Sequence, residues 1–259
     1  MGQTIIEQPV AIHNAPILAN DLGQSLPQPK PQFIYEDQPL SSRTFSGPIV
    51  KGQSTKVTIY TRNQLIASGL CAALEDMINL SFRSQSCRDQ GILQAHDRLR
   101  SPGQQLAEIG HDPETFIFVI QIEATGEICG TAYATRYEGV EEWPEGPGER
   151  TWERLGIEAS GIEAWELHMM AVHPDFQRQG LADYLMKITD REILRRCGPA
   201  VGVKRVMLIS TVKETNERFY TRKGFVLDYA VKWPDGHRDS KAFTVIHMRR
   251  EIKASEDCD

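Results

Sequence analysis

The chain has 259 residues, of which 40% are hydrophobic and 25% are charged, and its formal net charge is −6. Such a chain can bury a sizeable core, and its acidic balance without a lysine or arginine cluster argues against a nucleic-acid partner. No apolar run reaches the roughly 18 residues that span a membrane, and the N-terminus lacks a secretory signal pattern. We therefore expect a cytoplasmic protein that does not contact a membrane.

The five cysteines are odd in number, widely spaced and free of any C-x-x-C pair. Reduced thiols in a cytosolic protein fit this distribution better than a disulfide framework or a zinc site. The seven histidines show no metal-ligand spacing either. We therefore expect no bound metal.

Residues 1–54 differ from the rest of the chain because they carry seven prolines and little hydrophobic periodicity. This composition predicts an extended N-terminal arm, which could cross to a second subunit. Residues 55–252 are predicted to form the folded domain, and residues 253–259 a C-terminal tail.

The first elements of the domain are predicted from periodicity. Residues 56–61 alternate between apolar and polar side chains, which predicts a strand. Residues 83–113 are polar and are expected to contain helix and loop. Between them, residues 63–82 predict an amphipathic helix whose buried side carries Leu65, Leu70, Leu74, Met77 and Ile78.

A β-hairpin and a long loop follow. Residues 116–122 predict a buried strand, residues 124–126 a turn, and residues 127–137 the partner strand. Residues 138–163 are expected to be a loop that contains eight glutamates. A solvated charged loop is the simpler interpretation of this acidic segment.

The next segment combines a strand, a tight turn and a helix. Residues 165–172 predict a central strand, and a Gln-x-x-Gly-x-Ala turn at Gln177, Gly180 and Ala182 leads into the helix. Unpaired N–H groups in the first turn of a helix, together with the helix dipole, favour a bound anion. The two small residues keep the backbone accessible, and Arg178 can add a charge-assisted contact. The sequence therefore predicts a phosphate-binding cradle.

The remaining elements complete a pattern of about seven strands and about four helices. The helix after the cradle is predicted to run to about Arg196, followed by a strand at 204–212 and a short helix around Tyr220. The final hairpin is predicted at 225–233 and 242–248.

These motifs resemble the GNAT superfamily of N-acetyltransferases, whose signature is Arg/Gln-x-x-Gly-x-Gly/Ala after a strand. The chain also carries Phe219-Tyr220 and Gly224-Phe225, which resemble the Phe-Tyr-x-x-x-Gly-Phe segment of that family. The resemblance implies the GNAT acyl-CoA N-acyltransferase fold of the α/β (α+β) class. In that fold a mixed central sheet is flanked by helices.

The resemblance further implies acetyl-CoA as co-substrate. The turn would hold its pyrophosphate, and the strand before the turn would pair with its pantetheine arm. Many members place an asparagine where this chain has Lys213, whereas Asn216 matches another variant, so which of the two contacts coenzyme A stays open. The cofactor-binding residues implied in this way are Met170, Ala171, Val172, Gln177, Arg178, Gln179, Gly180, Leu181, Ala182, Asn216 and Phe219.

Candidate catalytic residues come from the central strand and the short helix. Glu166 and His168 are two positions apart, so their side chains share one face of the strand. This strand is similar to that of serotonin N-acetyltransferase, where two histidines remove the amine proton through water. The resemblance implies Glu166 as proton acceptor, with His168 as its partner or alternative, and Tyr220 as general acid. Glu166 could instead pair with an arginine, and His168 could be an ordinary core histidine.

The function implied is acetyl transfer to a primary amine of a small molecule, by direct attack in a ternary complex. A protein N-terminal or lysine acetyltransferase, and a non-catalytic protein that binds coenzyme A, are the alternatives. If the acidic loop overhangs the acceptor pocket, it would favour a cationic amine. A homodimer is compatible with this fold.

Overall fold

The computed structural model describes residues 42–83, 98–99, 103–109, 112–137, 149–150, 161–198, 203–236 and 241–253. The chain divides into two units, Met1–Pro39 and Leu40–Asp259, and the described residues belong to the second. Most of the predicted arm and tail, and most of the predicted acidic loop, lie outside the described residues. The division into arm, domain and tail therefore stays a prediction.

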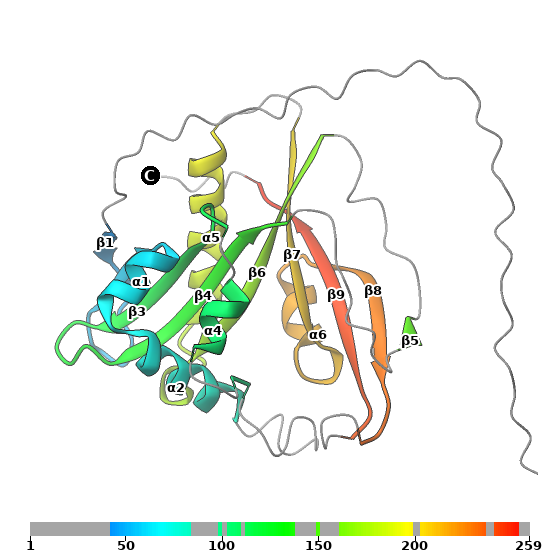
Figure 1. The fold of residues 1–259 in the computed structure, drawn as a ribbon, viewed down its shortest axis with the longest axis horizontal. Helices are drawn as coiled ribbons and strands as arrows, with labels where there is room; N and C mark the ends of the chain where they lie inside the picture. The colour runs from blue at the N-terminus through cyan, green and yellow to red at the C-terminus, as the bar shows by residue number, and fades with distance from the viewer. Residues whose placement is uncertain are drawn as a thin grey trace, which may run out of the picture. The chain divides into compact units, whose positions relative to one another are not determined.

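A mixed nine-stranded sheet forms the centre of the described part (Figure 1). Its strands are β1 (Arg43–Ser46), β2 (Thr55–Tyr60), β3 (Phe116–Ile122), β4 (Ile128–Arg136), β5 (Glu149–Arg150), β6 (Ile162–Val172), β7 (Lys204–Val212), β8 (Val226–Trp233) and β9 (Phe243–Glu251). The order across the sheet is β1-β2-β3-β4-β6-β7-β9-β8-β5. Among these neighbours only β6 and β7 run parallel, as their crossover through a helix requires.

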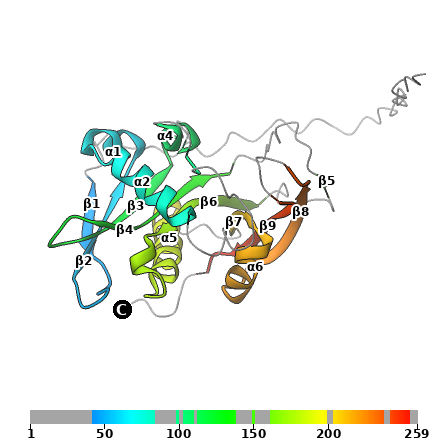
Figure 2. The same ribbon diagram turned by 90° about the horizontal axis from the view of Figure 1, so that it is seen from below.

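Helices lie on both faces of the sheet. They are α1 (Arg62–Ser68), α2 (Cys71–Phe82), α4 (Gln104–Ile109), α5 (Leu181–Cys197) and α6 (Lys213–Arg222), with a short 3-10 helix, η1 (Pro174–Phe176). Figure 2 shows α1, α2 and α4 on one side of the sheet and α5 and α6 on the other. The predicted fold class, a mixed sheet flanked by helices, is confirmed.

Two short strands were not predicted. β1 lies within the range predicted as the arm and pairs with β2, where Phe45 is opposite Val57. β5 lies within the predicted loop 138–163 and pairs with only two residues of β8. Strands of four and two residues are too short to show a periodicity, so only tertiary pairing reveals them.

The single helix predicted at 63–82 is wrong, because the structure has two helices there. Thr61 and Gln64 form a capping box that starts α1. Gly69 ends α1 in the left-handed conformation with φ 73°, and α2 then runs at 102° to α1. The hydrophobic spacing continues across the break, so periodicity alone could not detect the stop that Gly69 supplies.

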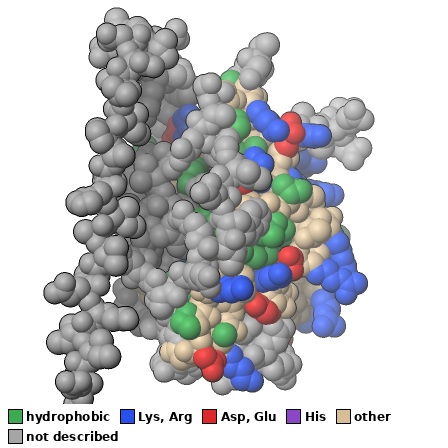
Figure 3. Space-filling view, turned by 90° about the vertical axis from the view of Figure 1, so that its right-hand side faces the viewer, with side chains coloured by type: hydrophobic (Ala, Val, Ile, Leu, Met, Phe, Trp, Pro, Cys, Tyr) green, Lys and Arg blue, Asp and Glu red, His purple; other side chains and the backbone are tan. Residues whose placement is uncertain are grey.

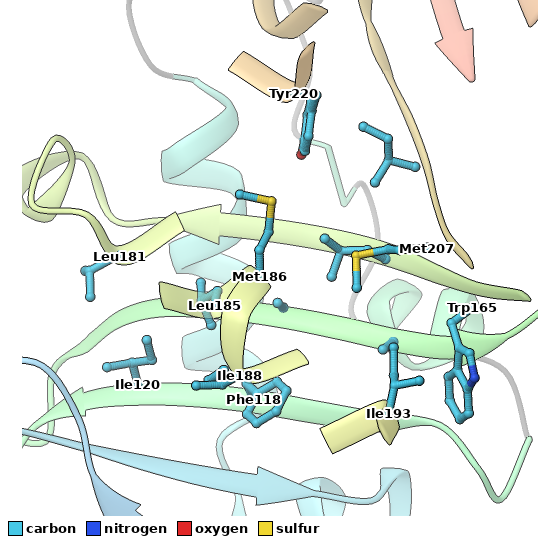
Figure 4. Close-up of a cluster of buried hydrophobic side chains, with 14 of the residues drawn as sticks. Phe118, Ile120, Trp165, Leu181, Leu185, Met186, Ile188, Ile193, Met207 and Tyr220 are labelled. Carbon is cyan, nitrogen blue, oxygen red and sulfur yellow. The ribbon is translucent and has the colours of Figure 1, made fainter. Parts of the chain in front are cut away.

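Apolar side chains fill both faces of the sheet. All seven residues of β3 are buried, because helices cover both sides of this strand. Leu65, Leu74 and Ile78 pack on the α1–α2 side. The cluster on the α5–α6 side (Figure 4) includes Phe118, Ile120, Trp165, Leu181, Leu185, Met186, Ile188, Ile193, Met207 and Tyr220. Burial of each large apolar side chain contributes roughly 2 kcal/mol.

The sheet opens between β6 and β7. Their pairing ends at Glu166 and Leu208, although both strands continue. Figure 1 shows β6 and β7 diverging toward their C-terminal ends. Met169 has φ 43° and lies where the register between β4 and β6 shifts. This β-bulge turns the end of β6 away from β7, and the opening determines where a ligand can enter the sheet.

The charged surface near β8 is seen in Figure 3, which views the right-hand side of Figure 1. Lysine and arginine side chains gather on the coloured part of this face, with acidic side chains between them. β5 covers only Val231 and Lys232 of β8, and Val226 is 58% exposed. Charges beside a partly open strand discourage pairing with another sheet.

A buried carboxylate joins α5 to the first strand. Glu192 is 2% exposed and accepts hydrogen bonds from Arg43 on β1 at 3.0 Å, Arg195 at 2.7 Å and Arg196 at 2.8 Å. Burial opposes ionisation, but the hydrogen bonds from Arg195 and Arg196 hold the pKa of Glu192 below its ordinary value. The carboxylate therefore stays charged in the folded protein at neutral pH.

Replacing Glu192 by glutamine should lower the free energy of unfolding by about 3 kcal/mol at pH 7, because three arginines lose their shared partner. The unfolded carboxyl binds its proton at higher pH than the folded one, so this stabilisation is complete above the ordinary value of 4.5 and is lost as pH falls below it. Urea denaturation at pH 7 and pH 4 measures both effects. Glu123→Gln, at an exposed position, is the control. Equal losses of unfolding free energy in the two variants would contradict the prediction.

Candidate functional site

A pocket of about 510 Å³ lies beside the opening of the sheet. Its walls come from the end of β6, the loop that follows, the N-terminus of α5, α6 and the end of α2. The lining residues are Ser81, Phe82, Met170, Val172, Gln177, Arg178, Gly180, Leu181, Ala182, Asp183, Asn216, Phe219 and Tyr220. Segments distant in the sequence therefore converge on one cavity.

The loop between β6 and α5 is fixed by local contacts. His173 caps η1, because its Nδ1 accepts a hydrogen bond from the Asp175 N–H at 3.2 Å. The Gln177 side chain donates from Nε2 to the Val172 carbonyl at 3.2 Å. Arg178 has φ 60° and Gly180 has φ 80°, a region in which only glycine is comfortable. Backbone strain at Arg178 marks a loop whose geometry is determined by its surroundings.

The N-terminus of α5 points its free donors at the pocket. Gly180 is the N-cap and provides no side-chain hydrogen bond to the helix, so the first N–H groups of a 17-residue helix are available to a ligand. The helix dipole adds positive potential there, and Arg178 lines the same wall. Asp183 carries the opposite charge, but Lys223 pairs with it at 2.5 Å. This end of the pocket suits a phosphate or pyrophosphate.

Helix α6 supplies the opposite wall. Tyr220 is 9% exposed, and its ring makes edge contacts with Phe219 at 5.0 Å and Phe225 at 5.5 Å between ring centroids. Figure 4 shows the Tyr220 hydroxyl directed from α6 toward the sheet. Burial raises the pKa of this phenol well above its usual value of 10, so Tyr220 keeps its proton at neutral pH. Asn216 donates from Nδ2 to Thr211 Oγ1 at 2.9 Å.

The bulge at Met169 shifts the alternation of side chains along β6, so the residues after it change face relative to those before it. Met170 and Val172 line the pocket, whereas Ala171 packs in the cluster beneath α1 and α2. Glu166 and His168 precede the bulge and lie on the α1–α2 face, with His168 Nε2 and Glu166 Oε2 3.3 Å apart. The Glu166 side chain is 20% exposed and that of His168 is 36% exposed, so both can meet a solute.

The structure brings ten of the fourteen predicted site residues to the pocket wall. Ala171, Gln179, Glu166 and His168 are not among its lining residues. Sequence reasoning missed Ser81, Phe82 and Asp183. Asp183 follows the cradle motif directly and could have been found there, but nothing local indicates that the end of α2 reaches the site.

The described residues contain no group of three or more histidine, cysteine, aspartate or glutamate side chains that could hold a metal ion. No single helix among them is long and apolar enough to cross a membrane, and the bent pair α1 and α2 meets that test only by length and composition.

The fold thus places an uncapped helix N-terminus beside an opening between two parallel strands. Residues 113–227 match the family model described as Acetyltransferase (GNAT) domain. These residues therefore form a GNAT acetyltransferase domain, in agreement with the predicted resemblance to the GNAT superfamily. The matched residues run from the end of the α4 loop to β8 and include the whole β6–α5–α6 site.

Several solved structures are similar to this chain at low sequence identity. The ribosomal-protein-S18-alanine N-acetyltransferase of Escherichia coli is 17% identical over 79% of this chain and 99% of its own, with a TM-score of 0.44. YncA of Salmonella typhimurium, solved with acetyl-CoA, is 15% identical over 79% and 98%, with a TM-score of 0.48. An aminoglycoside 6'-N-acetyltransferase complexed with coenzyme A is 14% identical over 78% and 99%, with a TM-score of 0.46. No curated protein sequence matches the chain.

Proposed function

We propose that the chain is an acetyl-CoA-dependent N-acetyltransferase that moves the acetyl group to a primary amine of a small molecule. The observation that carries this proposal is that the uncapped N-terminus of α5 and the buried Tyr220 line one pocket at the opening of the sheet. An anion site and a protonated phenol in one cavity suit a donor with a pyrophosphate at one end and a thiolate leaving group at the other.

The residues at the pocket fit coenzyme A in three respects. The first N–H groups of α5 and the Arg178 guanidinium would hold the pyrophosphate. The end of β6 has no partner in β7 beyond Glu166, so the backbone at Met170 and Val172 can pair with the amide-rich pantetheine arm. Bound in this way, acetyl-CoA supplies a thioester whose carbonyl can be polarised by the Met170 N–H.

Acetyl transfer requires a neutral amine and a protonated leaving group. Glu166 takes a proton from the ammonium group, with His168 at 3.3 Å as its partner or alternative. Tyr220 donates its proton to the departing sulfur, a role that suits a phenol whose raised pKa keeps it protonated. Direct attack follows because donor and acceptor are held on two sides of one opening, in a ternary complex.

Asn216 rather than Lys213 should contact coenzyme A. Asn216 lines the pocket, whereas Lys213 is not among its lining residues. Asn216→Ala should raise the acetyl-CoA Kd roughly tenfold, the cost of about one hydrogen bond, and Lys213→Ala should change it less than twofold. Calorimetry on both variants measures the difference, and the reverse order would assign the contact to Lys213.

A thiol-release assay tests the proposed reaction. Purified protein and acetyl-CoA are incubated with phenethylamine, spermidine, glucosamine or a hexapeptide that begins with alanine and contains lysine. Turnover of one of the three small amines supports the proposal, and spermidine would favour the cationic acceptor. Turnover of the peptide alone would contradict a small-molecule acceptor and indicate a protein acetyltransferase. Binding of acetyl-CoA without turnover of any of the four compounds would indicate a non-catalytic protein that binds coenzyme A.

A further inference from the structure

A second pair of polar side chains lies on β7 and β9. Ser210 Oγ and His247 Nδ1 are 2.7 Å apart, and the two residues are directly opposite each other in the sheet. The imidazole is 6% exposed and stacks on the Tyr229 ring at 4.1 Å with 3° between the planes. Ser210 itself is exposed. The pair therefore presents one accessible hydroxyl backed by one buried, oriented imidazole.

This pair shares a face of the sheet with Glu166 and His168. Met207 and Ile209 pack on the α5–α6 side, so the alternating residues Leu208 and Ser210 point to the other side. Glu166 is opposite Leu208, the last pair before the strands diverge. His168 and Ser210 each lie two residues further along their strands, on the two sides of the opening.

The described helices leave Ser210 accessible. On this face α2 packs against β4 and β6, and α1 packs against β2 and β3. α6 packs against β7 and β9, but from the opposite face, because its Tyr220 belongs to the cluster with α5. Figures 1 and 2 show the same arrangement of these helices. Glu166 and Ser210 are therefore directed to the same face of the sheet, on neighbouring strands at the opening.

Acetyl transfer to an ammonium group requires the nitrogen to lose two protons. We infer that Ser210 and His247 form a relay that accepts one of them, opposite Glu166 and His168, an inference that rests on the proposed function. As the nitrogen bonds to the acetyl carbon, its proton passes to Ser210 Oγ and the serine proton passes to His247 Nδ1. The carbon–sulfur bond breaks with its electron pair on sulfur, which takes a proton from Tyr220.

The surroundings of His247 suit this role. When the proton of the neutral imidazole is on Nε2, the Ser210 hydroxyl donates a hydrogen bond to Nδ1. The serine oxygen can then take a proton from the amine of the acceptor substrate. Proton transfer creates an imidazolium directly over the Tyr229 ring, where a cation–π contact stabilises it. Ser210 would be a catalytic residue because it touches the acceptor, and His247 acts through it.

The relay is tested with Ser210→Ala, Ser210→Thr, His247→Gln and the double variant Ser210→Ala/His247→Gln. The thiol-release assay uses whichever amine of the four-member panel the wild type acetylates best. Ser210→Ala should lower kcat about 100-fold, with KM values and the acetyl-CoA Kd within threefold of wild type. Threonine keeps the hydroxyl and should restore kcat to within about fivefold. Because the two residues act as one unit, the double variant should be no slower than the slower single variant.

The matched control is Thr44→Ala, which removes a hydroxyl that hydrogen-bonds Thr58 at the far edge of the sheet and should leave kcat unchanged. A readout without substrate is the ¹⁵N spectrum of the histidine side chains. The His247 signal, identified by its loss in His247→Gln, should shift in Ser210→Ala.

Three results would overturn the relay. A wild-type protein that acetylates no amine of the panel overturns both the relay and the proposed function. An active wild type with unchanged kcat in Ser210→Ala overturns the relay alone. If the fold-decreases of kcat in Ser210→Ala and His247→Gln multiply in the double variant, the two residues make separate contacts and do not form a relay.

Discussion

Replacing Gly180 by glutamate should abolish acetyl-CoA binding, with a rise of the Kd of at least 100-fold. Gly180 is the N-cap of α5 and has φ 80°, so any side chain adds strain of about 1 kcal/mol. A Cβ at this position would meet no protein atom within 4 Å. The side chain would therefore extend into the space of the pyrophosphate and bring a negative charge to the site that must bind an anion.

Gly126→Glu is the matched control for Gly180→Glu. Gly126 lies in the turn between β3 and β4 with φ 74°, and a Cβ there also meets nothing within 4 Å. It therefore imposes the same backbone strain and the same charge change away from the pocket, and should leave the Kd unchanged. Calorimetric titration measures both variants after circular dichroism has shown that they are folded. Normal binding by Gly180→Glu would move the phosphate site away from α5.

Tyr220→Phe should lower kcat about 100-fold and change the acetyl-CoA Kd less than twofold. The variant keeps the aromatic ring and its edge contacts with Phe219 and Phe225, so the pocket wall stays intact. Only the proton for the leaving sulfur is lost. Single-turnover thiol release separates this chemical step from product release. Tyr184→Phe on α5, outside the pocket lining, is the control, and full turnover by Tyr220→Phe would exclude Tyr220 as the acid.

The raised pKa of Tyr220 also predicts a stability effect in alkali. The folded phenol holds its proton above the ordinary value of 10, whereas the unfolded phenol ionises there. The contribution of Tyr220 to the free energy of unfolding is therefore fully present below pH 10. It falls as pH rises above 10, because the unfolded state then binds fewer protons than the folded state. Denaturation between pH 9 and pH 11 should show a steeper loss for wild type than for Tyr220→Phe.

The sequence was sufficient to predict the parts of the site that depend on short segments. A turn with Gly180 at its helix N-cap and a helix that places Tyr220 before Gly224 are local features, and residue type and spacing determine them. The strongly apolar segment at 116–122 also formed the predicted strand with the predicted bounds. The order of the elements then followed from the resemblance.

The parts that could not be predicted depend on contacts between distant segments. The left-handed residue Met169 shifts the alternation of side chains along β6, and no sequence rule indicates a bulge at a methionine. Without this shift, Met170 and Val172 would share a face of the strand with Glu166. Ser210 and His247 are 37 positions apart and meet only through the register of β7 and β9. Phe82 reaches the pocket because Gly69 bends the first helical segment, which periodicity treats as one helix.

Calorimetric titration with acetyl-CoA and with free coenzyme A tests whether the opening between β6 and β7 is an acetyl-CoA site. We predict that both bind with micromolar Kd at a stoichiometry of about one, as expected for a pocket that holds the shared nucleotide and pantetheine parts. Folded protein that binds neither compound would contradict the account.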